Sequence, residues 1–513
     1  MNNFIAIPLL VLCMASTAVA NVTLPSIIGD NMVLQQKTAS AIWGKAEPGE
    51  KVSVEGSWKG AQAQSAVADA KGNWMVKIKT PSAGGPFSLA IIGDNMIELK
   101  NVMSGEVWFS GGQSNMDMPL LGYGDDQPVT GGTEAIANAD HPDIRLFNVE
   151  PLKAAKEPQF TCPGEWQPCS PETVGMFSAI AYIFGKEIHK HTDVPVGLIH
   201  SCVGGTYLET WMKPEVIEND PEFKKIISGF DQYKEDWISK NPEYKDKPDA
   251  ELPFQFQDFE RTGRLYNGMI APLIPFTIKG AIWYQGESNG GRGHQYQRLF
   301  PAMITSWREE WNQGDFPFYF VQLANFIEHK PTEEVKYEKP AMPQPHGWAE
   351  LRNAQLLTLS VTNTGMAVTI DIGEANNIHP ANKIDIGKRL SLWALAKDYG
   401  KKDLVYSGPL YKSMKVESDK IHVSFDHTDG GLVAKGGKLE GFAIAGADEK
   451  FVWADAVIDG NTVIISNAEI KEPVAVRYAW ELFPLCNLYN GADLPASPFR
   501  TDDWKLPSAG KAF

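Results

Sequence analysis

Strand-like and helical segments alternate through the middle of this 513-residue chain, and this alternation limits the fold more than any other feature. Apolar residues spaced by three and four, as over residues 177–188 and 386–394, predict amphipathic helices between short apolar runs of strand length. Strands that alternate with helices form a parallel sheet with helices on both faces. We therefore predict an α/β fold with three layers, α/β/α, for residues 104–400. The five strands predicted for its parallel sheet are residues 107–110, 196–200, 278–284, 318–324 and 365–372.

The regions on either side of this segment have a different pattern. Residues 21–103 contain short alternating runs, such as 51–54 and 75–79, separated by turn residues, which predicts a β-sandwich-like domain. Residues 401–513 are again β-rich and either form a second sandwich or complete the N-terminal one. The strands expected there include residues 420–425, 456–458 and 462–466.

The first twenty residues have the pattern of a secretory signal peptide. An apolar run from Ile5 to Ala20 ends in the small residues Ala18 and Ala20, although no Lys or Arg precedes it. No other run reaches the roughly 18 apolar residues of a membrane-spanning helix. We therefore expect an exported protein, periplasmic or extracellular, that lacks a membrane span and loses residues 1–20.

Net charge and cysteine spacing argue against several functions. The chain carries 47 basic and 63 acidic residues, for a net charge of −16, whereas binding to nucleic acid or anionic membranes needs clustered Lys and Arg. The spacing of Cys162, Cys169, Cys202 and Cys486 fits no common zinc pattern, so we expect no metal site. Cys162 and Cys169 flank a loop with Pro and Gly. We predict a disulfide between them, with free thiols as the alternative.

Residues suited to chemistry follow four of the predicted strands, where parallel sheets bind their ligands. Ser114 lies at a strand-to-helix turn, which would expose its Oγ. Gly204 and Gly205 would let backbone N–H groups approach a ligand, and His379 has the position of a general base. Each segment alone also fits a plain turn, cap or surface loop. The four segments are residues 110–116, 201–206, 283–290 and 371–380.

The third of these segments offers a second candidate serine. Residues 286–290 match G-x-S-x-G, the nucleophile elbow of α/β-hydrolases. The pattern is short, and the residues after it do not begin a clear helix. An esterase or peptidase that uses Ser288 stays open as an alternative. His189 and His191 lie at a predicted helix end and are interpreted as solvated rather than metal-binding.

Together these segments resemble the sequence blocks of the SGNH hydrolase clan. More narrowly, the chain resembles the bacterial sialate O-acetylesterase family and its carbohydrate acetylesterase relatives, over nearly all of its length after residue 20. The resemblance implies the SGNH-type α/β/α fold with flanking β-sandwich-like domains. It is carried by residues 112–116, 204–205, 265–273, 283–289, 378–380, 487–490 and 494–500, together with Lys383 and Arg389.

The resemblance implies hydrolysis of acetyl esters on sugars, with an acetylated sugar or glycan as the partner and without a metal or cofactor. Ser114 would be the nucleophile and His379 the general base. The backbone N–H groups of Ser114 and Gly205, with the side-chain amide of Gln285, would form the oxyanion hole. A neutral amide can donate to an oxyanion, whereas the carboxylate of Glu287 would repel it. Glu287 is therefore expected to have a structural or substrate-orienting role.

The chain departs from the resembled pattern at the third member of the triad. Clan members often carry an Asp three residues before the His, and many sialate esterases carry one two residues before it. Asn376 and Asn377 occupy these positions. An Asn oxygen, a backbone carbonyl, or the more distant Asp371 or Glu374 would then face Nδ1 of His379. We favour a Ser–His dyad oriented by neutral oxygens.

The substrate stays open on sequence grounds. Sialic acid is the favoured acetyl carrier, and xylan or another plant polysaccharide is the alternative. Because sialic acid is anionic, it favours a cation near the cleft, for which Arg264, Arg292 and Arg352 are candidates. A carbohydrate-binding protein with impaired catalysis is a further alternative, supported by the two Asn residues before His379.

Overall fold

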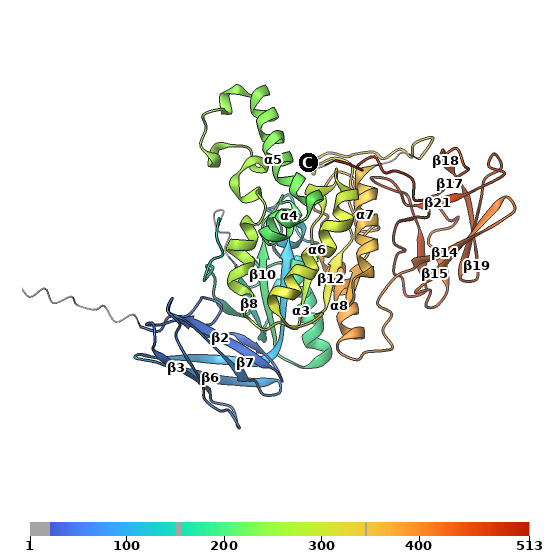
Figure 1. Cartoon of the computed structure of the whole chain (residues 1–513). Coiled ribbons are helices and arrows are strands. Elements are labelled where there is room, and N and C mark those ends of the chain that lie inside the picture. Colours follow the sequence, from blue (N-terminus) through green and yellow to red (C-terminus); the bar gives the residue numbers. More distant parts are fainter. Residues whose placement is uncertain (1–20, 150–154, 344–345, 512) are drawn as a thin grey trace, which may run out of the picture.

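One long strand connects two β-sheets of this protein. Figure 1 shows the computed structural model, which describes residues 21–149, 155–343, 346–511 and 513. Strand β7 spans Met96–Gly112. Its first half pairs antiparallel with β6 (Gly84–Ile92), and its second half pairs parallel with β10 (Val196–Cys202) and β11 (Gly280–Tyr284). The boundary predicted at residue 103 falls inside β7, and the division into domains stays a prediction.

The central sheet has the predicted parallel arrangement, with one parallel strand more. Its order is β13-β12-β11-β7-β10-β8-β9, and all neighbouring pairs are parallel except β8 and β9. The added parallel strand is β8 (His141–Asn148), which the sequence did not indicate because Asp143 and Arg145 interrupt its apolar pattern. The remaining strands are β9 (Trp166–Cys169), β12 (Phe318–Val321) and β13 (Thr364–Ala367).

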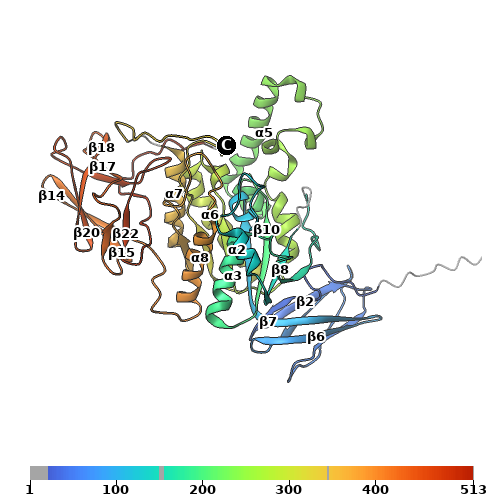
Figure 2. The same ribbon diagram turned by 180° about the vertical axis from the view of Figure 1, so that it is seen from behind.

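Helices cover both faces of this sheet. Adjacent side chains of β7 point to opposite faces and therefore contact different helices. Trp108 packs against Phe184 of α3, with ring centroids 4.9 Å apart, and Phe109 packs against Trp307 of α6 at 5.4 Å. Helices α3 and α8 lie side by side on one face, and α6 and α7 on the other (Figures 1 and 2). The helices are α1 (Ser114–Asp117), α2 (Gly132–Ala137), α3 (Ala179–Thr192), α4 (Pro214–Asn219), α5 (Pro221–Lys240), α6 (Gly293–Trp311), α7 (Gly347–Leu357) and α8 (Lys383–Lys397).

The N-terminal β region packs two small sheets against each other. Strands β2 and β5 form one sheet, and β1, β3, β4 and β6 join the first half of β7 in the other. Ile42, Val54, Trp74 and Val102 are among the buried side chains between them. The strands are β1 (Val33–Gln35), β2 (Ala39–Lys45), β3 (Lys51–Gly56), β4 (Gln64–Val67) and β5 (Asn73–Lys79).

The strands of the C-terminal β region form sheets of their own and, among the described residues, pair with none of the N-terminal strands. Its two four-stranded sheets, β14-β15-β20-β19 and β18-β17-β21-β23, share a core that includes Val423, Ile444 and Val463. Figure 1 shows it apart from the N-terminal strands. Its strands are β14 (Leu410–Glu417), β15 (Lys420–Asp426), β16 (Leu432–Ala434), β17 (Phe442–Ala445), β18 (Phe451–Trp453), β19 (Asp455–Asp459), β20 (Thr462–Ser466), β21 (Ala475–Tyr478), β22 (Leu488–Asn490) and β23 (Phe499–Arg500).

The disulfide predicted between Cys162 and Cys169 is not formed in this structure. Both cysteines are free and buried. The extended strand β9 ends at Cys169, whose Sγ donates to the carbonyl of Ala139, while the carbonyl of Cys162 accepts a hydrogen bond from Ser26. The extended chain therefore holds the two thiols in different surroundings. Among the described residues, no helix is long and apolar enough to cross a membrane; the predicted signal peptide, residues 1–20, lies outside them.

Candidate active site

The four predicted segments meet beyond the carboxyl ends of the central strands. Ser114 is the first residue of α1 and is separated from the end of β7 by Gln113 alone. The turn needs Gly112, because its φ of 143° is in the region that glycine favours and a Cβ there would lie 2.1 Å from the carbonyl oxygen of Tyr284. Helix α1 is held from below by Ser178, whose hydroxyl donates to the carbonyl of Met116 at 2.6 Å. Backbone packing therefore fixes where Ser114 points.

His379 lies within hydrogen-bond distance of Ser114. Its Nε2 is 2.9 Å from the Ser114 Oγ, although the two residues are 265 positions apart in the chain. The loop that carries His379 connects β13 to α8. Tyr123 closes the other side, because its ring centroid lies 5.2 Å from that of His379 and its hydroxyl donates to the Ser114 carbonyl at 2.7 Å. Sequence reasoning did not identify Tyr123.

Gln127 faces the second ring nitrogen of His379. Its Oε1 lies 3.4 Å from Nδ1. Gln127 and Tyr123 belong to one tight loop, in which the N–H of Tyr123 donates to the Gln127 carbonyl. The N–H of Thr130 donates to the carbonyl of Ala381, so this loop is also attached to the segment after His379. A neutral amide oxygen thus occupies the place where a triad carboxylate would lie.

The residues predicted to orient His379 point elsewhere, which corrects that expectation. The Asn377 Oδ1 accepts from the backbone N–H of His379 at 2.9 Å, and the Asn376 amide donates to the carbonyl of Glu333 at 2.7 Å. The two distant carboxylates are also engaged. Asp371 forms a bidentate ion pair with Arg389, and Glu374 accepts from the N–H of Ala381. Among the described residues, none of these four side chains forms a hydrogen bond with the imidazole.

Asn115, the residue after Ser114, connects the turn after β7 to the loop that carries His379. Its side-chain amide donates to the Ile378 carbonyl at 3.0 Å and to Glu287 Oε1 at 2.5 Å. Its Oδ1 accepts from the Nζ of the fully buried Lys383 at 2.5 Å. Glu287 is therefore one member of this network, and its structural or substrate-orienting role stays a prediction. Neither the contacts of Asn115 nor the hydrogen bond from Lys383 was identified from sequence.

Gly204 and Gly205 bring the backbone after β10 next to Ser114. A Cβ on Gly204 would lie 3.1 Å from the Cβ of Ser114. Gly205 has a φ of 74°, and within the described residues its N–H donates no hydrogen bond. This donor is therefore available for the predicted oxyanion-hole role, which stays a prediction.

Gln285 does not have the free amide that an oxyanion donor needs, which corrects the predicted role of its side chain. Gln285 is fully buried, and its Nε2 donates to the Thr206 carbonyl at 3.0 Å and to Asn289 Oδ1 at 2.8 Å. Its Oε1 accepts from the Tyr296 hydroxyl at 2.9 Å. Both amide hydrogens are therefore used to hold the loop after β10 against the loop after β11.

Ser288 contacts backbone rather than a base. It lies in the 3-10 turn η8 (Glu287–Asn289), and its hydroxyl donates to the Gly205 carbonyl at 2.7 Å. In the described part of the chain, no histidine forms a hydrogen bond with it. In this structure Ser288 therefore stabilises the turn at Gly205 through this hydrogen bond.

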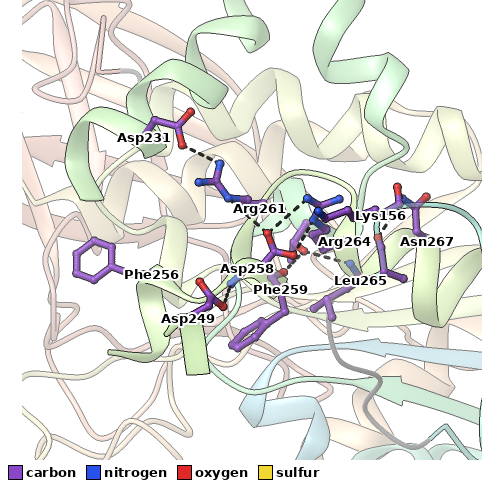
Figure 3. Close-up of polar contacts among 12 residues, drawn as sticks. Lys156, Asp231, Asp249, Phe256, Asp258, Phe259, Arg261, Arg264, Leu265 and Asn267 are labelled. Carbon is purple, nitrogen blue, oxygen red and sulfur yellow. Dashed lines mark hydrogen bonds and ion pairs between the residues drawn. The ribbon is translucent and has the colours of Figure 1, made fainter. Parts of the chain in front are cut away.

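The three candidate cations for an anionic substrate are all engaged in the fold. Arg264 pairs with Asp258, 3.1 Å from Nε to Oδ2, as Figure 3 shows, and Arg292 pairs with the buried Glu209 at 2.6 Å. Arg352 is fully buried, which corrects its proposed role in orienting the substrate. Its guanidinium donates to the carbonyls of Leu323, Ala324, Glu481 and Leu482. It joins α7 and the loop after β12 to the C-terminal region.

The surroundings of His379 favour its neutral form. Burial, the ammonium of Lys383 and the ring of His329 together lower the pKa of His379 to about 4. The His329 ring centroid lies 5.7 Å away. Burial also lowers the pKa of Lys383 to about 7, against the opposing effect of Glu287 and Glu374, and raises the pKa of Glu287. His379 is therefore available to accept a proton at neutral pH.

A solved carbohydrate acetylesterase of Xanthomonas citri matches this structure along almost its whole length. The two are 36% identical, with a TM-score of 0.79, over 94% of this chain and 100% of that one. The chain belongs to the carbohydrate acetylesterase family. This enzyme is therefore a carboxylic ester hydrolase that acts on acetylated carbohydrates, and the alternative of a binding protein with impaired catalysis is not supported.

Two further comparisons agree with this family. Residues 254–392 match the family model described as "Carbohydrate esterase, sialic acid-specific acetylesterase". The chain is 28% identical to the mouse sialate O-acetylesterase, over 92% of this chain and 93% of the mouse protein. It is also 28% identical to the human sialate O-acetylesterase, over 92% and 91% of the two chains.

The low pKa of His379 predicts an unusual acid limb in the pH profile of this acetylesterase. A general base must be neutral, so activity is lost as the pH falls through its pKa. We expect kcat/KM for a neutral acetyl ester to be half-maximal at about pH 4, rather than near the ordinary histidine value of about 6.5. Steady-state assays from low to neutral pH, with circular dichroism to confirm folding, measure this. An acid limb near the ordinary value would contradict it.

Proposed function

We propose that this acetylesterase removes O-acetyl groups from sialic acids by serine acyl transfer. The observation that carries the proposed mechanism is the 2.9 Å distance between the Ser114 Oγ and His379 Nε2. Ser114 Oγ attacks the acetyl carbonyl carbon while its proton moves to Nε2. The backbone N–H groups of Ser114 and Gly205 face the oxyanion.

Two further steps, loss of the sugar and hydrolysis of the acetyl-enzyme, return the enzyme to its starting state. The bond from the acetyl carbon to the sugar oxygen breaks, and the sugar oxygen takes the proton from Nε2. The acetyl group then remains on Ser114. Water attacks this acetyl-enzyme, gives its proton to the same nitrogen, and acetate leaves as Ser114 recovers its proton.

The proposed role of His379 requires its other proton on Nδ1, so that Nε2 can accept. We assign Gln127 Oε1, at 3.4 Å, as the acceptor that selects this tautomer. A neutral oxygen orients the ring but stabilises the imidazolium less than a carboxylate would. This weaker partner is consistent with the low pKa of His379, which burial, Lys383 and the ring of His329 lower.

Replacing Gln127 tests this assignment. Gln127→Ala should lower kcat by about tenfold, the value of one hydrogen bond, with little change in KM. Gln127→Glu should move the acid limb to higher pH, because a carboxylate beside Nδ1 favours the imidazolium. The matched control is Asn376→Asp, which adds the same charge to a side chain directed at the Glu333 carbonyl. An acid limb that moves in the control but not in Gln127→Glu would contradict the assignment.

The identity of the sugar rests on the relatives. The mouse and human proteins that the chain resembles are sialate O-acetylesterases, and the matched family model is sialic acid-specific. One structural observation favours neutral sugars as a second candidate: Arg264, Arg292 and Arg352 are all engaged within the fold. Acetylated xylan or another plant polysaccharide is that candidate.

One set of assays tests the nucleophile and the substrate together. Acetate release should be faster from O-acetylated sialic acid than from acetylated xylan, and Ser114→Ala should lower kcat on either by at least about 10³-fold. Ser288→Ala is the comparison variant: it removes only the hydrogen bond to the Gly205 carbonyl and should lower kcat by no more than about tenfold. Faster release from xylan would reassign the substrate. Activity of Ser114→Ala above about a tenth of wild type would instead reject the nucleophile, since nucleophile loss costs far more.

We further infer that the protein is exported to the periplasm or beyond. The support is the apolar run that ends at Ala18 and Ala20. N-terminal sequencing of the protein recovered outside the cytoplasm should begin at Asn21. Recovery of the intact N-terminus from the cytoplasm alone would contradict export.

A further inference from the structure

An aromatic side chain lies exposed beside the glycine of the proposed oxyanion hole. Phe254 begins the 3-10 turn η4 (Phe254–Phe256), and 44% of its surface is exposed. Its ring lies over Gly205, because a Cβ on that glycine would be 2.9 Å from the ring carbon Cε1. Neither the sequence patterns nor the mechanism above uses this side chain.

Close contacts lead from the nucleophile to this ring. A Cβ on Gly204 would lie 3.1 Å from the Cβ of Ser114, and the next residue, Gly205, meets Phe254. For an ester whose carbonyl carbon lies at the Ser114 Oγ, with its oxygen at the Gly205 N–H, these short distances put Phe254 within reach of the alcohol portion. In an acetyl ester of a sugar, that alcohol portion is the sugar itself.

The ring of Phe254 is held by the segment around it. Phe259 packs edge-on against it, with centroids 4.6 Å apart at an interplanar angle of 65°. The Phe259 carbonyl accepts from the hydroxyl of Thr210, and the Phe256 carbonyl accepts from Lys234 Nζ of α5 at 2.9 Å. This preorganised ring can offer a binding surface without a large loss of side-chain entropy.

Ion pairs also hold this segment, as Figure 3 shows. Asp258 pairs with Arg261 at 3.5 Å and with Arg264 at 3.1 Å. Arg261 also reaches Asp231 of α5 at 2.7 Å, and the N–H of Asp258 donates to Asp249 at 2.6 Å. Lys234 pairs with Asp249 at 3.4 Å, so each of these carboxylates has a cationic partner. The exposed aromatic ring is what this segment presents beside Gly205.

We propose that Phe254 is the platform on which the sugar ring of the acetylated substrate stacks, and so determines specificity for carbohydrate esters. The proposal rests on the proposed role of Ser114. A sugar ring has an apolar face of C–H groups, and stacking this face on Phe254 removes apolar surface of both partners from water. Small esters without a ring gain nothing from this contact. The platform therefore distinguishes sugar esters from simple alkyl acetates.

Two esters separate this role from catalysis. The probes are a mono-O-acetylated methyl glycoside of N-acetylneuraminic acid or xylose, and ethyl acetate, which has no ring. Phe254→Leu should lower kcat/KM for the acetylated glycoside by about 5- to 30-fold, mainly through KM. It should leave ethyl acetate within about twofold of wild type. Phe254→Tyr, which keeps an aromatic ring, should retain both activities.

A binding measurement keeps this test independent of the nucleophile. In a Ser114→Ala background, calorimetric titration with the acetylated glycoside should give weaker binding when Phe254→Leu is added. Equal losses on both esters, or unchanged glycoside binding in the double variant, would overturn the platform. Hydrolysis by Ser114→Ala would reject the proposed function, whatever the Phe254 variants show. A thermal melt of each variant confirms that it folds.

Discussion

The side-chain amide of Asn115 sets the geometry on which the rest of the site depends. Asn115 follows Ser114 in the chain, and the carbonyl that it binds belongs to Ile378, which precedes His379. One hydrogen bond between these neighbours therefore controls the spacing of Ser114 and His379. The Asn115 oxygen is occupied by Lys383 and its second amide hydrogen by Glu287, so every group of this amide is used. Removing one partner from such a buried network leaves another unsatisfied, which costs more than the bond itself contributes.

The same network explains why the imidazole lies in a cationic rather than an anionic environment. The buried Lys383 donates a hydrogen bond to Asn115, and its charge lowers the pKa of His379. The carboxylates of the loop are used elsewhere, Asp371 with Arg389 and Glu374 at the start of the turn before α8. These carboxylates hold the loop in place through their own hydrogen bonds, and among the described residues neither forms a hydrogen bond that would stabilise an imidazolium. The histidine is therefore ready to accept a proton, but it holds the proton weakly once accepted.

The sequence was sufficient for the parts of this molecule that obey local rules. Alternating strands and helices predicted the three layers, and the positions of Ser114 and His379 after strands predicted that they would meet. The strand β8 was missed because its charged residues hide the apolar period. The contact of Gln127 with His379 spans 252 residues and depends on a loop shape that no local pattern encodes. Gln285 has a suitable amide, but whether that amide is free depends on the partners that the fold gives it.

Strand β7 makes the N-terminal β region part of the catalytic unit. Its residues pair with β6 at one end and with β10 and β11 at the other, and Ser114 follows it without a flexible connection. Because side chains alternate along a strand, a shift of one residue in the pairing with β6 would turn every later side chain to the opposite face. Pairing with the N-terminal sheet therefore helps to set the position and direction of Ser114. A sequence change in the N-terminal sheet can therefore alter the geometry at Ser114 through the register of this one strand.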